Sequence, residues 1–166
     1  GFDFIDFGSA SASWLLKGSS MQWKAAAPGK ILEAMANSNT INPVVLYDEI
    51  DKGIGSGRSY PPEVVLYQLF EKNNSSMFED EFLGMHFDAS TIINICTANT
   101  RNNIPQPLQS RLNIFEVKKL NAEQTRFLAQ KMYKKMVNEY TIFSEKLDES
   151  ILDLFKDMVP REIDRA

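Results

Sequence analysis

The sequence is poor in the residues that build disulfide frameworks and zinc sites. Its 166 residues include one cysteine, Cys96, and one histidine, His86. A single thiol excludes an internal disulfide and suits a reducing compartment. One cysteine and one histidine are too few for a zinc site. Because Cys96 falls inside a predicted strand, we expect an inert core thiol rather than a nucleophile.

The sequence also lacks a long apolar run and a strong charge of one sign. No stretch approaches the roughly 18 apolar residues that cross a bilayer, and no secretory leader pattern opens it, so we expect no membrane partner. Its 18 Lys and Arg against 22 Asp and Glu give a net charge of −4. Bulk charge therefore makes no case for nucleic-acid binding and leaves that question open. The content of 43% hydrophobic and 24% charged residues is typical of a globular protein with a core.

The first two thirds of the sequence have the pattern of an α/β fold. Short β-branched or aromatic runs predict strands at residues 2–7, 44–47, 91–97 and 112–117. The runs at 44–47 and 91–97 indicate buried strands, since a continuous apolar run is typical of a strand covered on both faces in a parallel sheet. Apolar spacing predicts helices at 30–36 and 61–72.

The pattern changes to all-helical after residue 119. Asn121 and Gln124 are spaced as a capping box. Apolar residues then recur every four positions from Leu128 to Tyr140, which predicts one long amphipathic helix, and a second helix is expected near Asp148. We therefore place a domain boundary between residues 119 and 120.

Polar side chains follow two of the predicted strands. Asp48 and Glu49 come directly after 44–47, and Asn99 follows 91–97. Ligands of open α/β sheets bind at the carboxyl ends of the strands. Neighbouring strand residues point to opposite faces, so one carboxylate can face a Mg²⁺–phosphate group while the other faces an attacking water. The alternatives are a solvated strand end and an Asn that serves only its own turn.

Arg111 follows a short turn that contains Pro105 and Pro107. An arginine on a rigid turn can be supplied to the phosphates of a neighbouring molecule. Taken alone, such an arginine is more often part of a surface ion pair.

Together these segments resemble the ATPase module of the Lon protease family, within the AAA+ ATPases. Residues 43–52 (PVVLYDEIDK) resemble its Walker B segment, 97–99 (TAN) its sensor 1, and 104–111 (IPQPLQSR) the segment that carries its arginine finger. Residues 26–31 resemble the run after its pore loop, and 159–165 the segment that carries sensor 2. The resemblance covers almost the whole chain in unbroken order.

The resemblance implies nucleotide-directed roles for five residues. Asp48 would help to hold Mg²⁺, Glu49 would polarise the hydrolytic water, and Asn99 would position that water or sense the γ-phosphate of ATP. Arg111 would reach the nucleotide of the adjacent subunit in a ring. Arg161 would contact the nucleotide from a helical lid; its alternative is a solvated charge at a helix start.

The resemblance also places the aromatic-plus-next pair of the pore loop on Trp23 and Lys24. Trp23 would grip an extended polypeptide by contact area rather than by specific hydrogen bonds. Its alternative is ordinary packing. The family usually has Tyr at the position of Trp23 and an aliphatic residue at that of Lys24.

The implied fold is a P-loop-type AAA+ core with a parallel sheet, present in part over residues 1–119, followed by the start of a helical lid domain over 120–166. The sequence contains no Walker A phosphate loop of the form G-x-x-x-x-G-K-[ST]. The Ser–Lys proteolytic dyad of Lon is also absent. We therefore expect a fragment that does not hydrolyse ATP by itself.

The implied function of the parent protein is ATP hydrolysis coupled to the unfolding and translocation of polypeptides, for ATP-dependent proteolysis. The cofactors would be ATP and Mg²⁺, and the assembly a ring, expected to be a hexamer. The compartment would be the cytoplasm or the mitochondrial matrix. One alternative is a non-proteolytic AAA+ remodeller or scaffold that acts on a protein complex or DNA. Another is a plain α/β binding module in which Asp48, Glu49, Asn99 and Arg111 are scattered in space.

Overall fold

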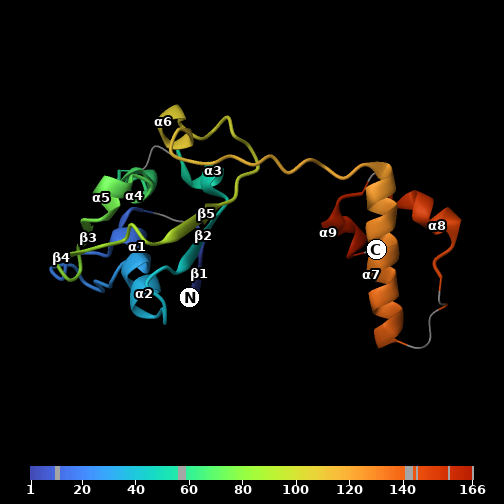
Figure 1. Cartoon of the computed structure of the whole chain (residues 1–166), viewed down its shortest axis with the longest axis horizontal. Helices are drawn as coiled ribbons and strands as arrows, with labels where there is room; N and C mark the ends of the chain where they lie inside the picture. The colour runs from blue at the N-terminus through green and yellow to red at the C-terminus, as the bar shows by residue number, and fades with distance from the viewer. Residues whose placement is uncertain (10–11, 56–58, 141–143, 145, 157, 166) are drawn as a thin grey trace. The chain divides into compact units, whose positions relative to one another are not determined.

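The computed structural model describes residues 1–9, 12–55, 59–140, 144, 146–156 and 158–165. It divides into two compact units, residues 1–114 and 115–166, while the predicted boundary lies between 119 and 120. Figure 1 traces the elements of each unit. Within the described ranges, no helix is both long and apolar enough to span a membrane.

A parallel three-stranded sheet organises the first unit. Its strands are β1 (Phe2–Asp6), β2 (Val44–Asp48) and β5 (Ile93–Cys96), in the order β1-β2-β5. Because β2 lies between two parallel neighbours, the carboxyl ends of all three strands meet at one edge. With the helix-rich second unit, this sheet confirms the predicted fold class.

One face of the sheet is packed. Ile5, Val45 and Tyr47 alternate with the residues of the other face and are buried. Their core also contains the buried side chains of helices α1 (Trp14–Lys17), α2 (Lys30–Ala36) and α4 (Glu63–Leu69). Helix α4 begins after Pro61 and Pro62 and is shorter than the predicted helix over 61–72.

The other face of the sheet is largely open among the described residues. On this face, Phe2, Phe4, Ile93 and Ile95 of the two outer strands are exposed. The prediction that 44–47 and 91–97 are buried on both faces is therefore wrong for the part of the chain that is described. In a parallel sheet, crossover helices usually cover both faces. Here the buried side chains of α1, α2 and α4 all belong to the core on the first face, so they do not cover the second.

A short hairpin, absent from the predictions, precedes β5. Strands β3 (Phe78–Asp80) and β4 (Met85–Phe87) pair antiparallel. The fully buried carboxylate of Asp80 accepts hydrogen bonds from the backbone N–H groups of Gly29, Phe82 and Leu83. It thus ties the hairpin to the start of α2. The remaining short helices of this unit are α3 (Ile50–Gly53), α5 (Lys72–Ser75) and α6 (Gln106–Gln109).

Residues 112–117 form no strand, contrary to the prediction. Residues 113–121 adopt neither helix nor strand, and Phe115 and Val117 are 86% and 93% exposed. A strand forms when another strand pairs with its backbone groups. The described part of the chain offers no such partner to this segment.

The second unit consists of α7 (Ala122–Glu139), α8 (Glu149–Leu154) and α9 (Pro160–Ile163) around a small core of Ala129, Leu152 and Ile163. The predicted capping box is confirmed. The Gln124 N–H donates to Asn121 Oδ1 at 2.8 Å, and the Asn121 N–H donates to Gln124 Oε1 at 3.0 Å. Two backbone donors at the start of α7 are satisfied in this way.

Candidate functional site

The chain turns sharply where β2 ends. Glu49 has φ 55° and ψ 47°, the left-handed helical conformation. This conformation costs an L-residue about 1–2 kcal/mol, so neighbouring contacts must hold it. The Glu49 N–H donates to Thr97 Oγ1 at 3.0 Å, and the Ile50 N–H donates to the Thr97 carbonyl at 3.0 Å. The end of β5 therefore fixes the turn that directs Glu49.

Asp48 is held from both neighbouring strands. The Thr97 hydroxyl donates to Asp48 Oδ1. The Asp48 carbonyl accepts from the N–H groups of Phe7 and Gly8, at 3.0 and 3.2 Å. Thr97 thus bridges the Asp48 carboxylate and the Glu49 backbone through a single hydroxyl, at the carboxyl edge of the sheet.

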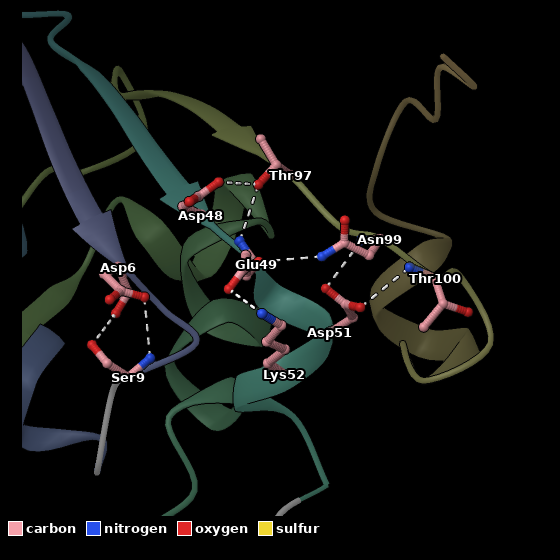
Figure 2. Close-up of polar contacts among 9 residues, drawn as sticks. All are labelled: Asp6, Ser9, Asp48, Glu49, Asp51, Lys52, Thr97, Asn99 and Thr100. Carbon is pink, nitrogen blue, oxygen red and sulfur yellow. Dashed lines mark hydrogen bonds and ion pairs between the residues drawn. The ribbon is translucent and has the colours of Figure 1, made fainter. Parts of the chain in front are cut away.

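The Glu49 carboxylate contacts two side chains, as Figure 2 shows. Asn99 Nδ2 donates to Glu49 Oε1 at 3.3 Å, and Lys52 Nζ lies 2.6 Å from Glu49 Oε2. The hydrogen bond to Glu49 raises the pKa of Lys52. A carboxylate oxygen accepts more than one hydrogen bond, so a water can still approach Glu49. Because Asn99 binds Glu49 and Asp48 is the preceding residue, the structure brings these three residues together.

Asp51 ties the loop after β5 to helix α3. Its side chain is buried, and its two oxygens accept from the N–H groups of Asn99 and Thr100, both at 3.2 Å. The sequence predictions did not single out Asp51 or Thr97, although both stand inside the quoted motifs. Residue type alone does not tell which backbone amide a carboxylate or hydroxyl will meet.

Arg111 contacts other residues of its own unit. Its Nε lies 3.2 Å from Glu71 Oε2, its Nη1 donates to the Pro107 carbonyl at 2.6 Å, and its guanidinium lies 5.8 Å from the Tyr67 ring centroid. The structure does not bring Arg111 into the group formed by Asp48, Glu49 and Asn99. The ion pair with Glu71 matches the alternative considered for it.

Trp23 and Lys24 lie on an exposed turn. Trp23 is 71% exposed, so it does not pack in the core. Two hydrogen bonds close the base of this loop: Ser19 N–H donates to the Ala27 carbonyl, and Ala27 N–H donates to Ser19 Oγ. The loop thus presents an aromatic side chain to solvent from a fixed base.

Arg161 belongs to the second unit, outside the unit that carries Glu49. It is an exposed residue of the short helix α9. Pro160 precedes it at the first helical position, where the missing proline N–H leaves no hydrogen bond unmade.

The carboxylates suit a magnesium ion that arrives with a nucleotide. Within the described ranges, no group of three or more His, Cys, Asp or Glu side chains could hold a metal by itself. Mg²⁺ on nucleotide phosphates instead takes one or two protein carboxylates and fills its other positions with phosphate oxygens and waters. Asp48, which Thr97 orients through one oxygen, fits that pattern.

Comparison with known proteins finds no matching protein-family model. The mitochondrial Lon protease homologue of Emericella nidulans is 33% identical over 126 residues, which cover 76% of this chain and 11% of that protein. The human homologue is 34% identical over 116 residues, covering 70% and 12%. The Lon protease of Malacoplasma penetrans is 30% identical over 159 residues, covering 91% and 20%.

The chain therefore spans between about a tenth and a fifth of the length of these curated relatives. The similarity extends over most of its residues and is shared by fungal, animal and bacterial proteins of one name. On that ground, and with a parallel α/β sheet followed by helices, this chain belongs to the Lon protease family.

Proposed function

We propose that this chain is part of a Lon-type AAA+ ATPase, which couples ATP hydrolysis to the unfolding and translocation of polypeptides for proteolysis. The hydrogen bond between Asn99 and Glu49, beside Asp48 at the ends of adjacent parallel strands, carries the proposal. A plain α/β binding module would not require these three residues to meet. Their meeting favours the ATPase.

The proposed chemistry uses ATP and Mg²⁺. Asp48 would contribute a carboxylate to the magnesium ion, and that ion would neutralise charge on the phosphates. Glu49 would accept a hydrogen bond from the attacking water and draw its proton. Asn99, which already donates to Glu49, would orient the same water. In phosphoryl transfer the protein mainly positions groups and stabilises charge, which is what these three side chains would do.

The remaining proposed roles involve other molecules. Arg111 would act on the nucleotide of an adjacent subunit in a ring, expected to be a hexamer, and Arg161 would act from the lid. Trp23 and Lys24 would contact the polypeptide substrate, a role that the exposure of Trp23 supports. The relatives are named as mitochondrial or bacterial Lon proteases, which supports the mitochondrial matrix or the cytoplasm as the compartment.

A chimera tests the proposal. In it, this chain replaces the aligned residues of the Malacoplasma penetrans Lon protease, with which it shares 159 aligned positions. We expect ATP hydrolysis by the chimera, and a loss of about 100-fold or more in turnover in the Glu49→Gln chimera, because the general base is removed. ATP binding should persist in that variant.

Glu116→Gln is the matched control, because Glu116 is an exposed carboxylate in the segment without regular structure. It should keep full turnover. Unchanged turnover in the Glu49→Gln chimera would exclude the proposed role. The isolated chain, which has no phosphate loop, should not hydrolyse ATP. Turnover by the isolated chain that Glu49→Gln abolishes would show that it needs no further segment.

A further inference from the structure

Asp51 is a charged side chain that the proposed reaction does not use, although it binds the backbone of Asn99. It is 5% exposed, whereas the nearby Glu49 side chain is about one-third exposed. Burial of a carboxylate is unfavourable unless hydrogen bonds replace its water. Both Asp51 oxygens meet this need through backbone N–H groups of the loop after β5.

The two amides that Asp51 binds belong to Asn99 and Thr100, so the contact fixes the backbone from which the Asn99 side chain extends. Asp51 is itself only two residues after Glu49, in the first turn of α3. The carboxylate therefore connects the backbone of the hydrogen-bond donor, Asn99, to the helix that follows the acceptor, Glu49. Figure 2 shows Asp51 between α3 and this loop.

A second contact between the same two segments lies on the other side of Glu49. Thr97 accepts from the Glu49 N–H and sets the turn. Its contacts hold residue 97, whereas Asn99 lies two residues further on. The contacts of Asp51 hold the backbone at the point from which the Asn99 side chain branches.

We infer that Asp51 is a positioning residue, which holds the Asn99 side chain within hydrogen-bonding reach of the Glu49 carboxylate. As a statement about ATP hydrolysis, this rests on the function proposed above. The contact between the two side chains does not depend on that function, so it can be tested without nucleotide. The alternative is a buried carboxylate that only stabilises the loop.

The test is an NMR coupling experiment on the 166-residue chain. Glu49→Gln should shift the side-chain NH₂ resonances of Asn99, because it changes their acceptor. In the Asp51→Ala background the same substitution should leave those resonances unshifted, because Asn99 no longer reaches Glu49. Amide exchange at Asn99 and Thr100 should accelerate about tenfold or more, since each loses a hydrogen bond to a charged group.

Asp80→Asn provides the structural control. Asp80 is also a buried carboxylate with backbone N–H partners, but it holds the β3–β4 hairpin. In that background, Glu49→Gln should still shift the Asn99 side chain. A role of Asp51 in loop stability alone would make the two aspartates behave alike.

Asp51→Asn keeps the experiment decisive if Asp51→Ala does not fold. The asparagine side chain has the same shape but a single acceptor oxygen, so at least one of the two amides should lose its protection.

The inference is overturned if both amides stay protected in Asp51→Asn. It is also overturned if Glu49→Gln shifts Asn99 equally with and without Asp51, or does not shift it at all. If the chimera fails to hydrolyse ATP while this coupling is observed, only the proposed function fails.

Discussion

Glu49 adopts the left-handed backbone conformation, which is unfavourable for a glutamate. Asn, Asp and Gly occupy that region more readily. The contacts with Thr97 compensate for the conformation locally. The stability of the turn therefore does not by itself explain a glutamate at this position. Strain at such a residue is typical of functional sites.

Cys96 gives a prediction about pH at the residue scale. Burial raises the pKa of its thiol from 9.0 to about 12. Below pH 9 the thiol is protonated in both the folded and the unfolded chain, so it adds no pH dependence. Between pH 9 and about 12 the unfolded chain releases the proton first. The free energy of unfolding then falls, by at most about 1.4 kcal/mol per pH unit.

Urea denaturation at pH 7 to 10.5, followed by tryptophan fluorescence, would measure this effect. Both tryptophans, Trp14 and Trp23, lie in the first unit. Cys96→Ala should lose less stability than the unsubstituted chain as the pH rises above 9. Parallel pH profiles for the two proteins would contradict the prediction. Buried Tyr47, whose pKa is raised mainly by desolvation, is present in both.

The sequence predicted that Asp48, Glu49 and Asn99 would meet if their two strands are neighbours, but not how they are held. The structure supplies that neighbourhood, since β2 and β5 pair in parallel. The supporting roles of Asp51 and Thr97 depend on which backbone amides face them. That arrangement is set by tertiary pairing.

At the element scale, the strands show where a local pattern fails. Residues 44–47 and 91–97 contain strands, since β-branched residues pack well on a pleated surface. Residues 112–117 have a similar composition but remain unpaired. A strand depends on a partner elsewhere in the molecule, and composition does not supply one. Helix α7 was predicted more accurately because its cap and its hydrogen bonds are local.

The capping box of α7 gives a second prediction. Asn121→Ala removes the oxygen that accepts from the Gln124 N–H, and should destabilise the helical unit by about 1 kcal/mol. Urea titration followed through the backbone NMR signals of α7 would measure it, because those signals report the helical unit alone. Asn138→Ala, in the last turns of the same helix, should be neutral or slightly stabilising, because alanine is the better helix former. Equal losses from both substitutions would contradict a specific cap.

At the scale of the whole molecule, two units of unequal core size share one chain. The first has a core of many buried side chains around its sheet, and the second has three. Independent cores of different size do not require a common transition, so two-state unfolding is not expected. Stability measurements should therefore follow each unit with its own probe.

Limited proteolysis provides a third prediction. Residues 113–120 are all exposed and have no regular structure, and they contain Lys118 and Lys119. Trypsin should cut there before it cuts at Lys131 within α7, because cleavage needs an extended, accessible backbone. Mass spectrometry of early digests would identify the cut. The double variant Lys118→Gln, Lys119→Gln should suppress it, and early cleavage at Lys131 instead would contradict the prediction.

The placement of the single cysteine has a practical consequence. Cys96 lies on β5, opposite Tyr47, and the same strand leads to Thr97 and Asn99. Cys96 is partly buried, and a thiol with so high a pKa reacts slowly near neutral pH. The rate at which a thiol reagent labels the native chain should therefore report how accessible Cys96 is at the end of β5, next to Thr97. The second unit contains no thiol and gives no signal in that measurement, so Cys96 is a built-in probe for the unit that holds Glu49.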